Sequence, residues 1–176
     1  MRRTSLRAIV VRVRPGARAR GWLRAGPQQI PVALGHSGIR ADKREGDRGT
    51  PRGRFRPLRV WWRADRGSRP HTPLPVRRIG PADGWCEDPS ERRYNRPIRV
   101  PPGSPGDRLW REDHLYDLLV EIDHNVRPRV SGRGSAVFMH VARPGLAPTA
   151  GCVALRAPAL RWLLARLGRK TRIMIH

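Results

Sequence analysis

Short apolar runs separated by glycine and proline fill the first third of the chain. The runs are residues 9–13, 21–24, 29–34 and 59–63. Runs of about four to eight residues rich in β-branched and aromatic side chains are typical of β-strands, and Gly and Pro between them are typical of turns. The pattern therefore predicts a β-meander at the start of the chain and, after it, a strand that carries Trp61 and Trp62.

The second half of the chain repeats this pattern and adds one helix. The further strand candidates are residues 116–123, 136–139 and 171–175. In residues 158–167 the leucines have the i, i+3, i+4, i+7 spacing of one helix face, with Pro158 near the first position and Gly168 just past the end. The chain is therefore predicted to be mainly β, a β-sandwich or partly open barrel of short strands with one or two α-helices next to the site described below.

Two long polar stretches interrupt the strands. Residues 38–55 are rich in glycine and charge, which predicts a surface loop. Residues 64–106 contain many prolines and glycines and show little periodicity, and a long irregular stretch in a compact domain tends to be functional or disordered. Its aromatic residues Trp85 and Tyr94 favour order. Residues 107–111 are predicted to form a short helical turn capped by Asp107.

Length and charge limit the classes of protein. A chain of 176 residues predicts a single domain covering residues 1–176. The formal net charge is +23, almost all of it from arginine, since Lys43 and Lys170 are the only lysines. Such a charge predicts attraction to polyanions: nucleic acid, an anionic membrane surface or a wall polymer rich in carboxylates.

Targeting, metal and nucleotide signals are weak. The basic residues 1–7 precede an apolar run of only residues 8–11, which is shorter than the apolar part of a signal peptide or a membrane span, so neither is predicted. The six histidines form no HExxH motif, and no glycine-rich phosphate loop joins a strand to a helix. No metal or other cofactor is therefore predicted.

The candidate chemistry lies in residues 135–155, where His140 and Cys152 stand at the two ends of one loop. A cysteine nucleophile needs a nearby imidazole to take its proton, and both need rigid support. Ala150 and Gly151 leave space beside the sulfur, and the backbone N–H groups of Gly151 and Cys152 are candidates for an oxyanion site. The alternative is an inert buried thiol and a core histidine. A disulfide with Cys86, the other cysteine, would leave Cys152 without a free thiol and so unable to act as a nucleophile.

These residues resemble the L,D-transpeptidases of the YkuD type, whose usual signature is a His after a strand, a loop, and then Ser/Thr-His-Gly-Cys. His140 and the residues 149–152 (Thr-Ala-Gly-Cys) match it, except that Ala150 replaces the second His, the loop is shorter, and Val153 stands where Arg or Asn commonly follows. The chain looks like a branch of the family that carries Thr-Ala-Gly-Cys. Residues 43–55 and 85–95 resemble two further elements of that branch, with Glu87 in place of an Asp.

The resemblance implies a peptidoglycan enzyme of the periplasm or cell wall. Cys152 is the expected nucleophile, His140 the general base and Gly151 a backbone oxyanion donor. The enzyme would cleave a donor stem peptide after its third residue, a diamino acid, and pass the acyl group from the thioester to an amine of a neighbouring stem. Carbapenem β-lactams are expected inhibitors. The expected substrate-binding residues are Thr149, Ala150, Arg143, Arg133, Tyr94, Asn95 and Trp85.

Some of these assignments have alternatives. Trp85 and Tyr94 are expected in a wall of the cleft, but aromatic side chains of this kind also pin loops to a core. Arg143 and Arg133 could bind substrate carboxylates bidentately, or could be solvated surface arginines.

Two other functions remain open. Water in place of the amine would make the protein an L,D-carboxypeptidase or amidase-type hydrolase. The charge also allows a basic nucleic-acid-binding protein, although basic and aromatic residues alternate only faintly, in residues 59–63, so nucleic acid is not the favoured partner.

Overall fold

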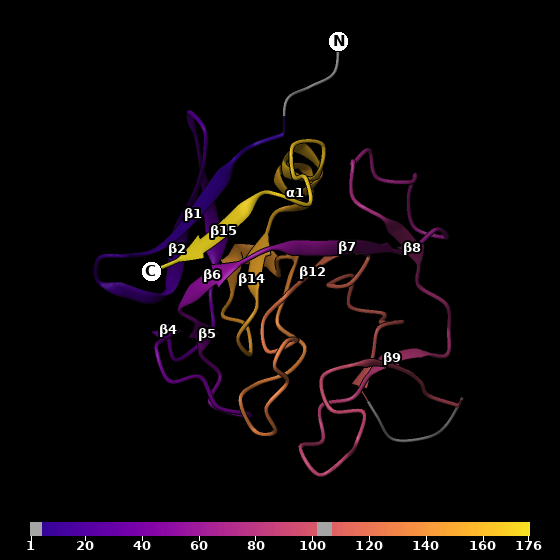
Figure 1. Ribbon diagram of the computed structural model, residues 1–176. Coiled ribbons are helices and arrows are strands. Elements are labelled where there is room, and N and C mark those ends of the chain that lie inside the picture. The colour runs from indigo at the N-terminus through magenta and orange to yellow at the C-terminus, as the bar shows by residue number, and fades with distance from the viewer. Residues whose placement is uncertain (1–4, 102–106) are drawn as a thin grey trace.

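The computed structural model describes residues 5–101 and 107–176, and its main feature is one curled sheet of ten strands (Figure 1). Its strands, in their order across the sheet, are β6 (Gly53–Phe55), β15 (Arg172–Ile175), β1 (Ala8–Arg14), β2 (Ala17–Ala25), β3 (Gln28–Ala33), β14 (Val153–Leu155), β13 (Phe138–Val141), β12 (Leu118–Ile122), β7 (Pro57–Trp62) and β8 (Val76–Arg78). The predicted mainly β fold is thus confirmed. The basic start of the chain, residues 1–4, lies outside the described residues.

Smaller elements complete the fold. They are a sheet of β10 (Pro97–Arg99), β9 (Asp83–Trp85) and β11 (Asp107–Arg108), a pair of β4 (Ile39–Arg40) and β5 (Thr50–Pro51), the helix α1 (Ala157–Leu164) and the 3₁₀ turn η1 (Pro144–Leu146). In Figure 1, α1 lies close to β15. β9 lies within residues 64–106, the stretch that the sequence marked as irregular. Residues 107–108 are therefore strand, where a helical turn was predicted, because Asp107 pairs with Trp85.

The N-terminal meander forms as predicted. β1 pairs antiparallel with β2 and β2 with β3, so that Leu23 lies between Val11 and Ile30. All three side chains are buried, because alternate residues of a strand point to the same face. β15 then pairs in parallel with β1.

Strand alternation divides the core between the two faces of the sheet. On one face, Val60 of β7 and Met139 of β13 pack into a large apolar cluster with the leucines of α1. On the other face, Trp61 and Phe138 belong to a second cluster that includes Cys152. Because successive side chains point to opposite faces, the strands bury one set of residues against the helix and present the next set to the candidate site.

The stretch 38–55 differs from the predicted surface loop. Its ends form β4, β5 and β6, Thr50 is fully buried and Lys43 is only 8 % exposed. Thr50 Oγ1 accepts a hydrogen bond from the Gly35 N–H (2.8 Å), and β6 pairs with β15. These long-range contacts bury part of a stretch that its charge alone placed in solvent. The helix also ends three residues before the predicted Leu167.

Candidate active site

The register of two parallel strands brings His140 and Cys152 together. β13 and β14 are neighbours, and His140 pairs with Ala154. Cys152 lies two residues before Ala154, so its side chain emerges on the same face as those of Phe138 and His140. The loop between the two residues returns the chain to the start of the parallel strand. The sequence placed them at the ends of one loop, and the strand pairing makes them neighbours.

Both residues line one cavity of about 210 Å³. Its lining consists of Glu87, Asp107, Arg111, Leu115, Tyr116, His140, Arg143, Ala147, Pro148, Thr149, Ala150 and Cys152. The thiol is thus buried but faces a cavity. Cys86 and Cys152 are both free, so no disulfide blocks the sulfur.

The thiol of Cys152 is held in its neutral form. Sγ accepts a hydrogen bond from the Phe138 N–H (3.3 Å) and donates one to the Ala136 carbonyl (3.2 Å). Burial raises the pKa of Cys152 to about 12, because a thiolate loses its hydration in this environment and the charges of Glu87 and Asp107 oppose it further.

His140 is also neutral. Its Nδ1 lies 2.8 Å from the Val141 carbonyl, which fixes the proton on Nδ1 and leaves Nε2 as the basic nitrogen. Burial lowers the pKa of His140 to about 4. The ring packs edge-on against Tyr116, with 5.3 Å between centroids. Within residues 5–101 and 107–176, no hydrogen bond joins this ring to Cys152 Sγ.

The turn before Cys152 is fixed by Thr149. Its Oγ1 donates to the Cys152 carbonyl (2.7 Å) and accepts from the Gly151 N–H (3.1 Å). The turn is also tied to the end of β3, since the Thr149 N–H donates to the Leu34 carbonyl (2.9 Å). The Gly151 N–H is thus engaged within the turn, which conflicts with its expected role as an oxyanion donor. Of the two N–H groups predicted from sequence, only that of Cys152 remains a candidate.

Gly151 is required by the backbone. Its φ is +143°, and a Cβ there would stand 2.8 Å from the carbonyl oxygen of Gly49. The stretch 38–55 therefore packs directly against the turn before Cys152, which gives its partial burial a structural role.

A pair of carboxyl groups shares the cavity with the sulfur. Glu87 follows β9 and Asp107 belongs to β11, and their side chains are hydrogen-bonded to each other. Burial of the carboxyl and the adjacent Asp107 raise the pKa of Glu87 to about 8, and burial also raises the pKa of Asp107. One proton is therefore shared by the pair at neutral pH.

Sequence reasoning missed Glu87, Asp107, Arg111 and Tyr116 as lining residues. Glu87 did lie in a stretch that resembles the family, and this was the only available signal. Asp107 and Tyr116 carried none, because the pairing of β9 with β11 and the fold of β12 place them there. Arg111 binds Asp113 through two nitrogens, at 2.9 and 2.6 Å.

The expected substrate residues separate into two groups. Arg143, Thr149 and Ala150 line the cavity, whereas Trp85, Tyr94, Asn95 and Arg133 do not.

The second group serves the fold. Trp85 is 3 % exposed and donates from Nε1 to Asn95 Oδ1 (3.0 Å), and Asn95 Oδ1 also accepts the Ala136 N–H (3.1 Å). The Tyr94 hydroxyl bonds Glu45, and Arg133 pairs with Asp42. These contacts hold the four side chains outside the lining of the cavity, although Trp85 packs in the same buried cluster as Cys152.

A comparison with known protein families decides the identity of the domain. A family model described as the YkuD L,D-transpeptidase catalytic domain matches residues 8–175. The chain belongs to the YkuD family. No curated protein and no solved structure matches it. The YkuD match runs from β1 to β15, so it contains the whole ten-stranded sheet together with His140 and Cys152.

Two further features concern the described part of the chain. No helix there has the length and apolar character needed to cross a membrane. No three His, Cys, Asp or Glu side chains there are grouped so that they could hold a metal ion.

Proposed function

We propose that this YkuD domain is a peptidoglycan L,D-transpeptidase that cross-links stem peptides through a thioester on Cys152. The observation that carries the proposal is the single cavity that contains Cys152, His140 and a carboxyl pair. A domain with this activity works in the periplasm or cell wall, where its substrate is found.

Proton transfer accompanies nucleophilic attack. With pKa values of about 12 for Cys152 and about 4 for His140, forming the thiolate and imidazolium in the free protein costs on the order of 10 kcal/mol. The thiol proton therefore passes to His140 Nε2 as Sγ bonds to the carbonyl carbon of the donor peptide. The Cys152 N–H supports the developing oxyanion.

The remaining steps return the proton. The leaving amine takes it from His140, which leaves the acyl group on Sγ as a thioester. An acceptor amine then attacks the thioester and loses a proton to His140. Collapse of the second tetrahedral intermediate restores the Cys152 thiol with that proton and releases the cross-linked product.

The carboxyl pair favours an amine acceptor over water. Glu87 and Asp107 together provide a negatively charged, hydrogen-bonding surface beside the sulfur, and an ammonium group is its natural partner. Arg143 lines the same cavity and supplies a guanidinium group for a carboxylate of a stem peptide, whereas Arg111 is held by Asp113. A hydrolase needs no amine-binding group at this position.

Acylation by a carbapenem tests the nucleophile. Incubation with the drug is expected to raise the mass of the intact protein by one acyl adduct, located on Cys152 by peptide mapping. Cys86→Ala is the matched control and keeps the adduct, whereas Cys152→Ala loses it. An adduct on Cys86, or none on the folded protein, contradicts the proposal. With purified wall material, cross-linked dimers support the transpeptidase, and trimmed stems alone support the hydrolase.

A further inference from the structure

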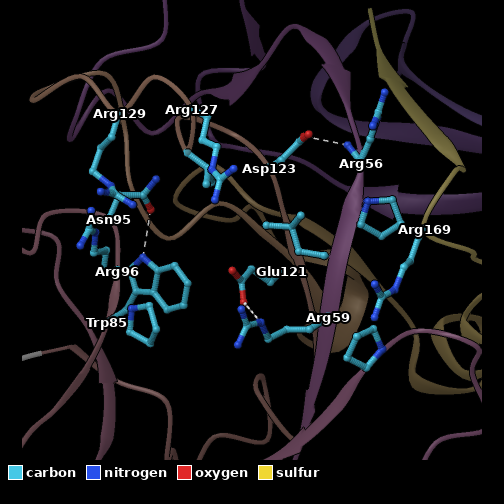
Figure 2. A pocket seen from close by; sticks show the side chains of 15 residues that line it. Arg56, Arg59, Trp85, Asn95, Arg96, Glu121, Asp123, Arg127, Arg129 and Arg169 are labelled. Atoms are coloured by element: carbon cyan, nitrogen blue, oxygen red, sulfur yellow. Dashed lines mark hydrogen bonds and ion pairs between the residues drawn. The ribbon is translucent and has the colours of Figure 1, made fainter.

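A second, larger cavity of about 790 Å³ lies apart from the site of Cys152 and shares no lining residue with it (Figure 2). Figure 2 shows Arg96, Arg127 and Arg129 on one side of the cavity and Arg169 on the other, with the side chain of Arg56 above Arg169 and pointing away. The cavity is therefore ringed by guanidinium groups from segments far apart in the sequence.

Most of this positive charge is not neutralised by the protein. The cavity contains Glu121 and Asp123, but Glu121 is held by Arg59 (3.0 Å) and by the Trp61 indole N–H (3.0 Å). Asp123 accepts the backbone N–H of Arg56 (2.7 Å). Of the arginines that line this cavity, only Arg59 forms an ion pair within the described residues; the others are Arg56, Arg96, Arg127, Arg129 and Arg169.

Arg129 is the most informative of these residues. Its Nε is buried and has no hydrogen-bond partner within the described residues. Buried donors are almost always satisfied, so an orphaned one indicates a missing acceptor. Burial and the neighbouring charge of Arg96 lower the pKa of Arg129. An anion between these two arginines would supply the acceptor and remove the repulsion.

Much of the remaining lining is apolar and favours a peptide. Pro57, Pro75, Pro97, Leu58 and Val126 provide surface for methyl and methylene groups between the arginines. Single-stranded nucleic acid needs exposed aromatic faces for stacking. Trp85, the aromatic residue of this cavity, is 3 % exposed and packs edge-on against Phe138, with 4.9 Å between centroids.

We propose that this arginine-lined cavity binds an acidic peptide segment carrying at least two carboxylates. Arginine forks bind carboxylates through paired hydrogen bonds, and the apolar lining accepts the segment between them. Identifying this segment as a peptidoglycan stem held away from the reacting one rests on the proposed function. The binding site itself does not depend on it.

Calorimetric titration of the full chain with a capped pentapeptide, Ala-Glu-Ala-Glu-Ala, tests the site. The protein carries Cys152→Ala, so that turnover plays no part. The double variant Arg96→Glu/Arg129→Glu is expected to weaken binding by at least about tenfold. The matched control, Arg12→Glu/Arg14→Glu, changes the same charge on the exposed β1–β2 hairpin and leaves binding within about twofold. The peptide with Gln in place of Glu is not expected to bind.

Several outcomes overturn the proposal. Equal weakening by both double variants shows attraction to overall charge only. Tighter binding of tripolyphosphate or of a dT oligonucleotide than of the peptide, lost in Arg96→Glu/Arg129→Glu, assigns the cavity to phosphates. If that variant fails to fold by circular dichroism, Arg127→Glu on the exposed rim replaces it and is expected to weaken binding about threefold. Peptide binding that persists while carbapenem acylation fails separates this site from the proposed function.

Discussion

At the scale of single residues, burial decides the protonation of Cys152 and His140. Cys152 and His140 lose hydration in the cavity, so the pKa of the thiol rises to about 12 and that of the imidazole falls to about 4. The Val141 carbonyl fixes the tautomer of His140 at the same time. The free protein therefore holds a neutral pair, and under the proposed function the sulfur becomes a nucleophile only once substrate is bound.

The stability of the protein should report the pKa of His140. In the unfolded chain His140 takes up a proton below about pH 6.5, but in the folded protein only below about pH 4. The unfolded state thus binds more protons between these values, so stability falls as pH drops through this window, by about 3 kcal/mol. His124 has a lowered pKa as well, so both proteins lose stability between pH 7 and pH 4. Urea unfolding is expected to show a loss about 3 kcal/mol larger in the wild type than in His140→Gln. If the two proteins differ in free energy of unfolding by the same amount at pH 7 and at pH 4, the lowered pKa of His140 is contradicted.

The carboxyl pair should decide the fate of the thioester. Asp107→Asn and Glu87→Gln remove the shared charge without changing shape, so binding of the acceptor amine weakens while acylation of Cys152 continues. The ratio of cross-linked to hydrolysed product is expected to fall about tenfold, because a charge-assisted contact contributes about 1.5 to 3 kcal/mol. Liquid chromatography of the products measures the ratio. Asp88→Asn, next to the pair but exposed, is the control.

At the scale of elements, paired strands carry the site residues. β13 and β14 align His140 and Cys152, and the three-stranded sheet brings β11 against β9 so that Asp107 meets Glu87. The turn before Cys152 is held between the end of β3 and the stretch 38–55. His140 and Asp107 thus lie in strands, and the turn that carries Cys152 is anchored by hydrogen bonding and packing to neighbouring segments.

A substitution at Gly84 tests whether the three-stranded sheet positions the carboxyl pair. Gly84 lies at the centre of β9, and a Cβ there would stand 2.4 Å from Val100 Cγ2 and 2.7 Å from the Asp107 carbonyl oxygen. Gly84→Ala must push β11 away and separate Asp107 from Glu87. Cross-linking is expected to fall at least about tenfold, with a loss of about 2 kcal/mol in stability from overpacking.

The control for this variant is Gly16→Ala in the β1–β2 turn. A Cβ at this position would meet no atom within 4 Å, so the only cost of the substitution is the backbone strain of the positive φ of +75°. If Gly84→Ala cross-links as well as Gly16→Ala does, the small sheet does not position the carboxyl pair.

At the scale of the whole molecule, the net charge of +23 acts on every anionic partner. Association with a carboxylate-rich wall is expected to be favoured at low salt and to weaken as ions screen the protein. Pull-down on insoluble peptidoglycan should lose at least about tenfold in affinity between roughly 50 and 500 mM NaCl. Salt-independent pull-down would show that apolar contacts dominate instead.

Local sequence patterns determined most of the secondary structure of this protein and pointed to two of its candidate site residues. Strand runs, turn residues and the leucine spacing of α1 depend on neighbours in sequence, so the mainly β fold and the helix could be predicted. His140 and Cys152 could be found because they flank one loop with a family signature. The family model then agreed over residues 8–175.

Only the tertiary structure decided what surrounds the sulfur. Glu87, Asp107 and Tyr116 reach it through pairings between distant strands, whereas Trp85 and Arg133 are held elsewhere by partners that no local pattern reveals. The neutral state of the thiol and imidazole was equally hidden, because a pKa depends on burial and nearby charge. Sequence periodicity specifies which residues turn inward, but long-range packing specifies which of them meet.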